Sequence, residues 1–202
     1  MKTLLAFCFI VMFITGRGQQ QALLLTAFTQ SYAEENTGNY SAAIKTLKSV
    51  YNEDNYEVNL RIGYLHYMAG LFTESLTYYQ RCIALMPYAI EARMGLVLPA
   101  AALGNWSMVE NEYKKILVTD PQNSIANYRM GLLLYGRKEY TSAYPYFEKV
   151  VNLYPFGYDA LLMFAWTHLQ LGKYREAKVL FQKVLLYSPG DASALEGMSL
   201  IK

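Results

Sequence analysis

The sequence predicts an all-α solenoid, built from a helical hairpin that repeats along the chain. Prolines recur at intervals of 34 residues: Pro87, Pro121, Pro155 and Pro189. One aromatic residue lies 15 positions before each proline (Phe72, Trp106, Tyr140, Tyr174), and a second lies 8 positions before it (Tyr79, Tyr113, Phe147, Phe181). A fold around one central core has no reason to repeat a helix breaker at constant spacing, whereas a stack of equal units ends each unit in the same way.

The first segment has a different character from the repeats. Lys2 precedes an apolar run over residues 4–15, which is followed by small residues around Arg17 and then by glutamines. As a helix this run would span about 18 Å, which is shorter than the ~30 Å hydrocarbon layer of a membrane. We therefore predict that residues 1–18 form a secretory signal peptide and that the protein is exported to the periplasm or secreted. The alternative is an uncleaved N-terminal helix that associates the protein with a membrane.

Five units follow the first segment. Counting back from the prolines places them at residues 24–55, 56–89, 90–123, 124–157 and 158–191. The first unit lacks the proline and has a connection that is two residues shorter. Because each unit can bury its apolar surface only against its neighbours, one elongated domain is expected.

Each unit contains two stretches with apolar residues at helical spacing, separated by a short turn. In the fifth unit, Leu161, Phe164 and Ala165 belong to the first stretch, and Ala177 and Leu180 to the second. A hydroxyl residue follows the turn aromatic in four units: Ser41, Thr73, Ser107 and Thr141. We predict that these hydroxyls cap the second helix.

Residues 192–202 begin a sixth first helix without a second helix after it. This partial capping helix carries Leu195, Met198, Leu200 and Ile201 and has little polarity. A terminal repeat needs a polar outer face for solubility. The apolar edge therefore predicts docking on a partner or on a second copy of the chain, which would give a homo-oligomer.

The repeated pattern resembles the tetratricopeptide repeat (TPR) family over about 168 of the 202 residues. The resemblance implies a right-handed α-solenoid that serves as an interaction scaffold. The chain departs from the family pattern in the third unit, where Val97 replaces a small residue and Pro99 follows inside the same helix. A proline there removes a backbone hydrogen bond and predicts a kink.

Composition and motifs argue against several classes of function. If the first 18 residues are removed, 16 basic residues balance 16 acidic ones, and no basic cluster offers a nucleic-acid surface. His66 and His168 lie three periods apart, so they occupy equivalent sites in separate units and are interpreted as structural. Cys82 is interpreted as a small core residue. No nucleotide-binding, metal-binding or nucleophile motif is found, so we predict a non-enzymatic protein without metal or cofactor.

The resemblance also implies a binding surface on the inner, concave face of the first helices. The residues that it places there are Phe28, Tyr32, Leu60, Tyr64, Tyr67, Met94, Leu98, Tyr128, Leu132, Tyr135, Leu162 and Trp166. Arg61 and Arg129 could add charge beside this stripe. The stripe lacks the Lys, Asn and Arg residues with which some family members clamp a chaperone tail. We predict that it binds a peptide or helix with apolar side chains. Two alternatives are a stripe partly packed against neighbouring units, and a structural subunit of an envelope complex.

Overall fold

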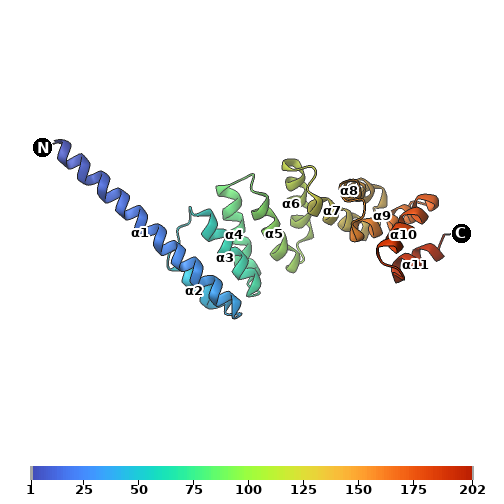
Figure 1. Cartoon of the computed structure of the whole chain (residues 1–202), viewed down its shortest axis with the longest axis horizontal. Coiled ribbons are helices and arrows are strands. Elements are labelled where there is room, and N and C mark those ends of the chain that lie inside the picture. Colours follow the sequence, from blue (N-terminus) through green and yellow to red (C-terminus); the bar gives the residue numbers. More distant parts are fainter. Residues whose placement is uncertain (1, 202) are drawn as a thin grey trace. The chain divides into compact units, whose positions relative to one another are not determined.

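The computed structural model describes residues 2–201, with side chains described from residue 18 onward, and within that range it contains eleven α-helices and no strand (Figure 1). The predicted all-α solenoid is confirmed, because the helices pack pairwise in chain order. The predicted signal peptide, residues 1–18, lies almost wholly outside the described side chains, which begin at Gly18. Among the described residues, no helix has the length and the apolar character needed to cross a membrane.

The chain divides into two compact units, Met1–Asn105 and Trp106–Lys202. The first unit holds α1 (Lys2–Asn36), α2 (Tyr40–Lys48), α3 (Tyr56–Met68), α4 (Phe72–Leu85) and α5 (Ile90–Ala102). The second unit holds α6 (Trp106–Thr119), α7 (Ser124–Gly136), α8 (Tyr140–Leu153), α9 (Tyr158–Gln170), α10 (Tyr174–Tyr187) and α11 (Ala192–Ser199).

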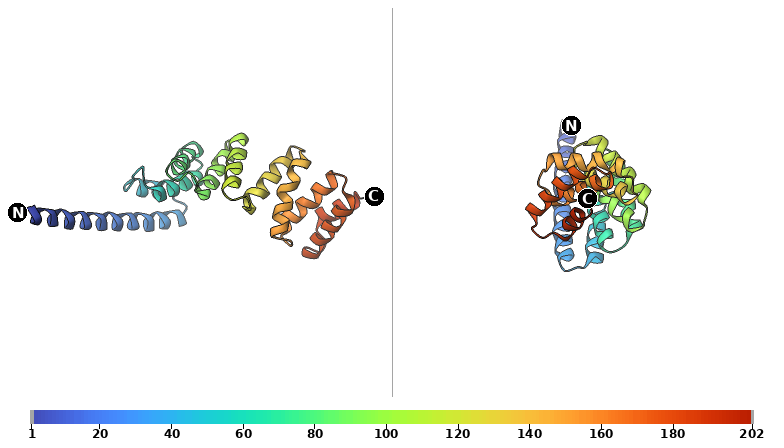
Figure 2. Two further views of the ribbon diagram at one scale, coloured as in Figure 1. Left: turned by 90° about the horizontal axis from the view of Figure 1, so that it is seen from above. Right: turned by 90° about the vertical axis from the view of Figure 1, so that its right-hand side faces the viewer.

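Within each unit, every helix packs on the next one along the chain, from α1 to α5 and from α6 to α11 (Figure 2). The first helices of successive hairpins also contact one another: α3 packs on α5, α7 on α9, and α9 on α11. Each unit therefore has a layer of neighbouring first helices. Side chains on the accessible face of this layer come together from different hairpins.

The turn inside each hairpin has one residue in the left-handed region. Four of these residues are glycines with φ between 71° and 76°, and the fourth hairpin has Lys138 with φ 63°. In the α7–α8 turn the backbone N–H of Lys138 donates to Tyr135 O (2.8 Å) and that of Glu139 donates to Leu134 O (2.9 Å). This pairing is the Schellman motif, which satisfies the last carbonyls of the first helix and reverses the chain.

The second periodic aromatic forms the contact between hairpins. The ring of Tyr79 is buried between α3 and α5, where a Cβ on Gly63 would lie 3.4 Å from it and a Cβ on Gly95 only 2.2 Å. Phe181 occupies the equivalent place against Gly197 in α11, where a Cβ would lie 2.1 Å from its ring. Small residues are therefore required on the first helices wherever the preceding aromatic approaches their backbone.

Buried polar side chains fix the connections that precede three of the first helices, α3, α5 and α7. Asn127 Nδ2 donates to Pro121 O (3.1 Å) and to Asn123 O (2.8 Å). Asn59 and Arg93, in the equivalent sites of α3 and α5, donate to carbonyls of their own preceding connections. These three side chains hold the loops and so set where each first helix begins.

The predicted hydroxyl caps are wrong. Ser41, Thr73, Ser107 and Thr141 are each the second residue of their helix, because the helix already begins at the aromatic before them. Asn39 caps α2 instead, and its side chain accepts from the backbone N–H of Ala42 at 3.1 Å. The aromatic starts the helix because the left-handed turn residue two positions earlier has already redirected the chain.

Candidate functional site

The predicted binding residues lie on the first helices α1, α3, α5, α7 and α9. Tyr32 and Leu98 are exposed, and the other ten are half-buried. None of the twelve is fully buried. The stripe is therefore accessible, although parts of it also pack against neighbouring side chains.

A pocket in the first unit brings four of these residues together: Phe28, Tyr32, Leu60 and Tyr64. It has a volume of about 490 Å³ and lies where α1, α3 and α5 present their side chains to one another. The remaining lining residues are Tyr56, Glu57, Arg61, Tyr79 and Glu91. Aromatic rings dominate the walls of this pocket, and its charged groups are mostly carboxylates.

Arg61 is held tightly at the pocket wall. Its guanidinium forms an ion pair with Glu35, and its Cζ lies 3.9 Å from the ring centroid of Tyr32 and 5.5 Å from that of Tyr64. The Arg61 and Glu35 side chains are only 10% and 18% exposed. Burial raises the pKa of Tyr64, and its hydrogen bond with Glu35 raises it further. The Tyr64 hydroxyl is therefore neutral near neutral pH, and because it donates its proton to Glu35, its oxygen remains as an acceptor.

Two further carboxylates, Glu57 and Glu91, line the pocket. Tyr56 Oη donates to Glu91 Oε1 at 2.9 Å, which joins the start of α3 to the start of α5. Burial, with this hydrogen bond, raises the pKa of Tyr56 far above its ordinary value. Glu57 is exposed beside Tyr56 and has no hydrogen-bond or ion-pair partner among the described residues.

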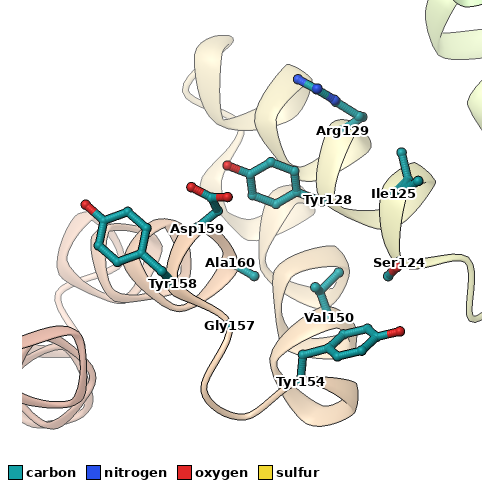
Figure 3. Close-up of a pocket in the computed structure, with 10 residues that line it drawn as sticks. All are labelled: Ser124, Ile125, Tyr128, Arg129, Val150, Tyr154, Gly157, Tyr158, Asp159 and Ala160. Atoms are coloured by element: carbon teal, nitrogen blue, oxygen red, sulfur yellow. The ribbon is translucent and has the colours of Figure 1, made fainter. Parts of the chain in front are cut away.

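A second pocket, of about 430 Å³, lies in the second unit between α7, α8 and α9 (Figure 3). Tyr128 on α7 is the predicted residue that lines it. Figure 3 shows the Asp159 side chain on α9 facing Tyr128, whereas the Arg129 side chain extends away from the pocket centre. Burial and the nearby Asp159 carboxylate raise the pKa of Tyr128, so its hydroxyl also stays neutral.

The two pockets occupy the same place in the repeat. Leu60 and Tyr128 lie 68 residues apart, which is two periods, and the same separation relates Arg61 to Arg129 and Glu91 to Asp159. The sequence pattern predicts a role for the two arginines but not for the acidic residue at the second position of the next first helix. The signal for it is periodic, because the second residue of the first helix is acidic in both Glu91 and Asp159, two periods apart.

The other predicted residues line neither of these pockets. Tyr67 packs against Phe72 with ring centroids 5.8 Å apart, and Tyr135 packs against Tyr140 at 5.1 Å. Trp166 Nε1 donates to Ser193 Oγ on α11 at 2.9 Å. Four further predicted residues are accessible but line neither pocket: Met94, Leu98, Leu132 and Leu162.

The described histidine and cysteine side chains, the types that most often take part in catalysis, are buried in this protein. His66 and His168 are buried, which lowers the pKa of both, and burial raises the pKa of the Cys82 thiol to about 12. Within the described residues, no group of three His, Cys, Asp or Glu side chains is placed to hold a metal ion. The pockets thus offer rings, hydroxyls and charges for recognition.

Comparison with known proteins agrees with this architecture. The tetratricopeptide repeat family matches residues 28–90 and 134–200. Anaphase-promoting complex subunit 7 of Arabidopsis thaliana is 23% identical over 166 residues, which cover 79% of this chain and 30% of that protein. The chain thus spans less than a third of this curated relative.

Solved structures share the fold. A tetratricopeptide repeat protein from Parabacteroides merdae has a TM-score of 0.75 at 23% identity, over 89% of this chain and 72% of that one. MamA has a TM-score of 0.70 at 19% identity, over 81% and 91%. YrrB, described as a TPR protein with an unusual peptide-binding site, has a TM-score of 0.67 at 20% identity, over 80% and 81%. The two family matches, which together cover more than half of the chain, show that it belongs to the tetratricopeptide repeat family.

Proposed function

We propose that this chain is a non-enzymatic scaffold that binds a peptide or helix of another protein along its first helices. The observation that carries the proposal is the first-unit pocket, in which Phe28, Tyr32, Leu60 and Tyr64 come together from two hairpins. The sequence pattern alone predicts all four as binding residues. Their shared pocket supports a binding role for the stripe.

Binding would depend on burial of apolar side chains from the partner against the rings. Each fully buried aliphatic or aromatic side chain contributes about 1.5–3 kcal/mol. The neutral hydroxyls of Tyr64 and Tyr128 can hydrogen-bond to the partner's backbone and so fix its orientation. Tyrosine suits this use because it combines a large contact area with a polar end.

A display library of short random peptides would test this function. We expect peptides selected on the wild-type protein to lose at least about tenfold in affinity on the double variant Tyr64→Ala/Tyr128→Ala, because each substitution removes an interface ring. Tyr88, which is 82% exposed in the connection between α4 and α5, provides the matched control Tyr88→Ala. Unchanged affinity on the double variant, with an intact circular dichroism spectrum, would refute the groove.

Export of the protein is part of the proposal and rests on the predicted signal peptide, residues 1–18. The mass of the protein recovered outside the cytoplasm would test it. A mass reduced by the first ~18 residues supports a cleaved signal peptide, and a full-length mass supports a retained N-terminal anchor.

A structural subunit is the second candidate function, and α11 favours it. Leu195 on this helix and Leu200, the residue directly after its end, are 50% and 55% exposed. The curated relative is by its name a subunit of a complex. Light scattering over a range of concentrations would detect self-association, which Leu200→Glu should abolish. A wild-type protein that stays monomeric would argue against a homo-oligomer formed through this edge.

A further inference from the structure

We propose that the first-unit pocket accepts a basic side chain, arginine or lysine, of the bound segment. The proposal rests on the peptide-binding function above and specifies the residue that the pocket selects. The pocket and its immediate wall contain one cation, Arg61, and three carboxylates: Glu35, Glu57 and Glu91. The site is therefore negative by two charges, although the whole chain carries a formal net charge of +2.

The positive charge of Arg61 is already compensated. It forms an ion pair with Glu35, stacks on the Tyr32 ring and is only 10% exposed. Its charge is thus neutralised locally and cannot balance Glu57 and Glu91. Those two carboxylates are exposed at the second residues of α3 and α5, beside the pocket.

The aromatic walls suit a cation as well as apolar groups. A guanidinium or ammonium group over a tyrosine face is attracted by the ring, most strongly where water is excluded. Arg61 itself shows the arrangement, since its guanidinium lies between a tyrosine ring and a carboxylate. Tyr56 Oη donates to Glu91, so one of the two carboxylates that lack a cationic partner among the described side chains is already oriented.

The wall also presents an unsatisfied donor. Arg61 Nε is buried and has no hydrogen-bond partner among the described residues. A buried donor without a partner destabilises the folded protein. A backbone carbonyl of the bound segment could satisfy it after a small shift of the side chain, which favours a peptide over a free cation.

The second-unit pocket provides a natural contrast. Ile125 replaces Glu57 there, and Asp159 replaces Glu91. Arg129 replaces Arg61 but is exposed and has no ion-pair partner among the described residues. One cation balances one carboxylate, so this pocket lacks the negative charge that would select a basic residue.

The test uses a library of short random peptides, selected in parallel on the full-length wild-type protein, on Glu57→Gln/Glu91→Gln and on Asp159→Asn. Asp159→Asn removes a carboxylate from the second position of α9, so it controls for loss of charge at a helix start. We expect the peptides selected on the wild-type protein to share an arginine or lysine at one aligned position. This preference should disappear among peptides selected on Glu57→Gln/Glu91→Gln and persist among those selected on Asp159→Asn. Replacing that arginine by citrulline, or that lysine by norleucine, should weaken binding about tenfold or more.

Three outcomes would overturn the proposal. Selected peptides that are apolar and uncharged, yet bind less well to Tyr32→Ala/Tyr64→Ala, would leave the binding function intact and refute the basic residue. A basic preference that survives Glu57→Gln/Glu91→Gln would also refute it. Failure to enrich any peptide that depends on Tyr32 and Tyr64 would overturn this proposal together with the proposed groove.

Discussion

At the residue scale, the hairpin turn shows which positions tolerate a side chain. Gly38, Gly70, Gly104 and Gly172 adopt the left-handed conformation at equivalent turns, where glycine carries no steric penalty. Lys138 adopts the same conformation with φ 63°. An L-residue with a Cβ pays about 1–2 kcal/mol there. The α7–α8 turn is therefore the strained member of the set.

We expect Lys138→Gly to raise the free energy of unfolding by up to about 1 kcal/mol, because relief of the left-handed strain exceeds the added entropy of the unfolded chain. Urea unfolding followed by circular dichroism would measure the change. Lys138→Ala keeps the Cβ and serves as the control, since it should bring no gain. Equal stabilisation by alanine and glycine would show that loss of the lysine charge, and not the backbone, is responsible.

The two buried histidines predict a pH dependence of stability. Burial is the main cause that lowers the pKa of His66 and His168 from the ordinary 6.5, while Lys48 and Lys173 lower it further and Glu74, Glu148 and Glu176 oppose the shift. Below pH 6.5 the unfolded chain binds protons that the folded chain does not yet bind. Stability is therefore fully present above pH 6.5 and falls as the pH drops through the lowered folded pKa values.

Urea midpoints between pH 7.5 and 5.5 would measure this loss, since most carboxylates remain ionised over that range. The double variant His66→Gln/His168→Gln should show a flatter pH profile than the wild type, even if it is less stable throughout. An identical pH profile in the two proteins would mean that other groups carry the proton linkage.

At the scale of the element, proline inside a helix is the main departure from the repeat. Pro99 lies within α5, and the helix continues beyond it to Ala102. The proline removes one backbone hydrogen bond and crowds the preceding turn, at a cost of about 3 kcal/mol or more. The side chain is also buried, so packing around the ring offsets part of that cost.

We expect Pro99→Ala to stabilise the first unit by about 1–2 kcal/mol, the helical gain minus the lost packing of the ring. Calorimetry would show a higher unfolding temperature. Pro87→Ala, in the connection between α4 and α5, is the control and should bring no such gain. A destabilised Pro99→Ala protein would indicate that the ring fills a space which the helix needs more than its missing hydrogen bond.

The elements were largely predictable because the 34-residue period repeats the same physical demands. The aromatic at Tyr79 and the small residue at Gly63 are local in sequence, so their pattern predicted the hairpin. The first-unit pocket was predicted only in part. Phe28 and Tyr64 belong to the recognised stripe, whereas Glu91 comes from the next hairpin and enters through its hydrogen bond with Tyr56. A periodic pattern shows which face a residue occupies but does not show which charges meet across hairpins.

At the scale of the whole molecule, packing between neighbouring helices makes cohesion local within each compact unit. The residues fall into two compact units, and within each unit every helix packs on its immediate neighbours in the chain. In such a protein, stability is approximately a sum of contributions from individual repeats and from nearest-neighbour interfaces. The effect of a core substitution should consequently fade within one or two hairpins.

Gly95→Ala tests this locality, because its Cβ would lie 2.2 Å from the buried ring of Tyr79 and must displace it. We expect faster amide hydrogen exchange in α3, α4 and α5 and unchanged exchange in α9, α10 and α11. Gly136→Ala, where an added Cβ meets no atom within 4 Å, is the matched control and should change exchange little in the first unit. Faster exchange along the whole chain in Gly95→Ala would instead demonstrate one cooperative domain. In that case the two pockets would be thermodynamically coupled through folding, and occupation of one would stabilise the other.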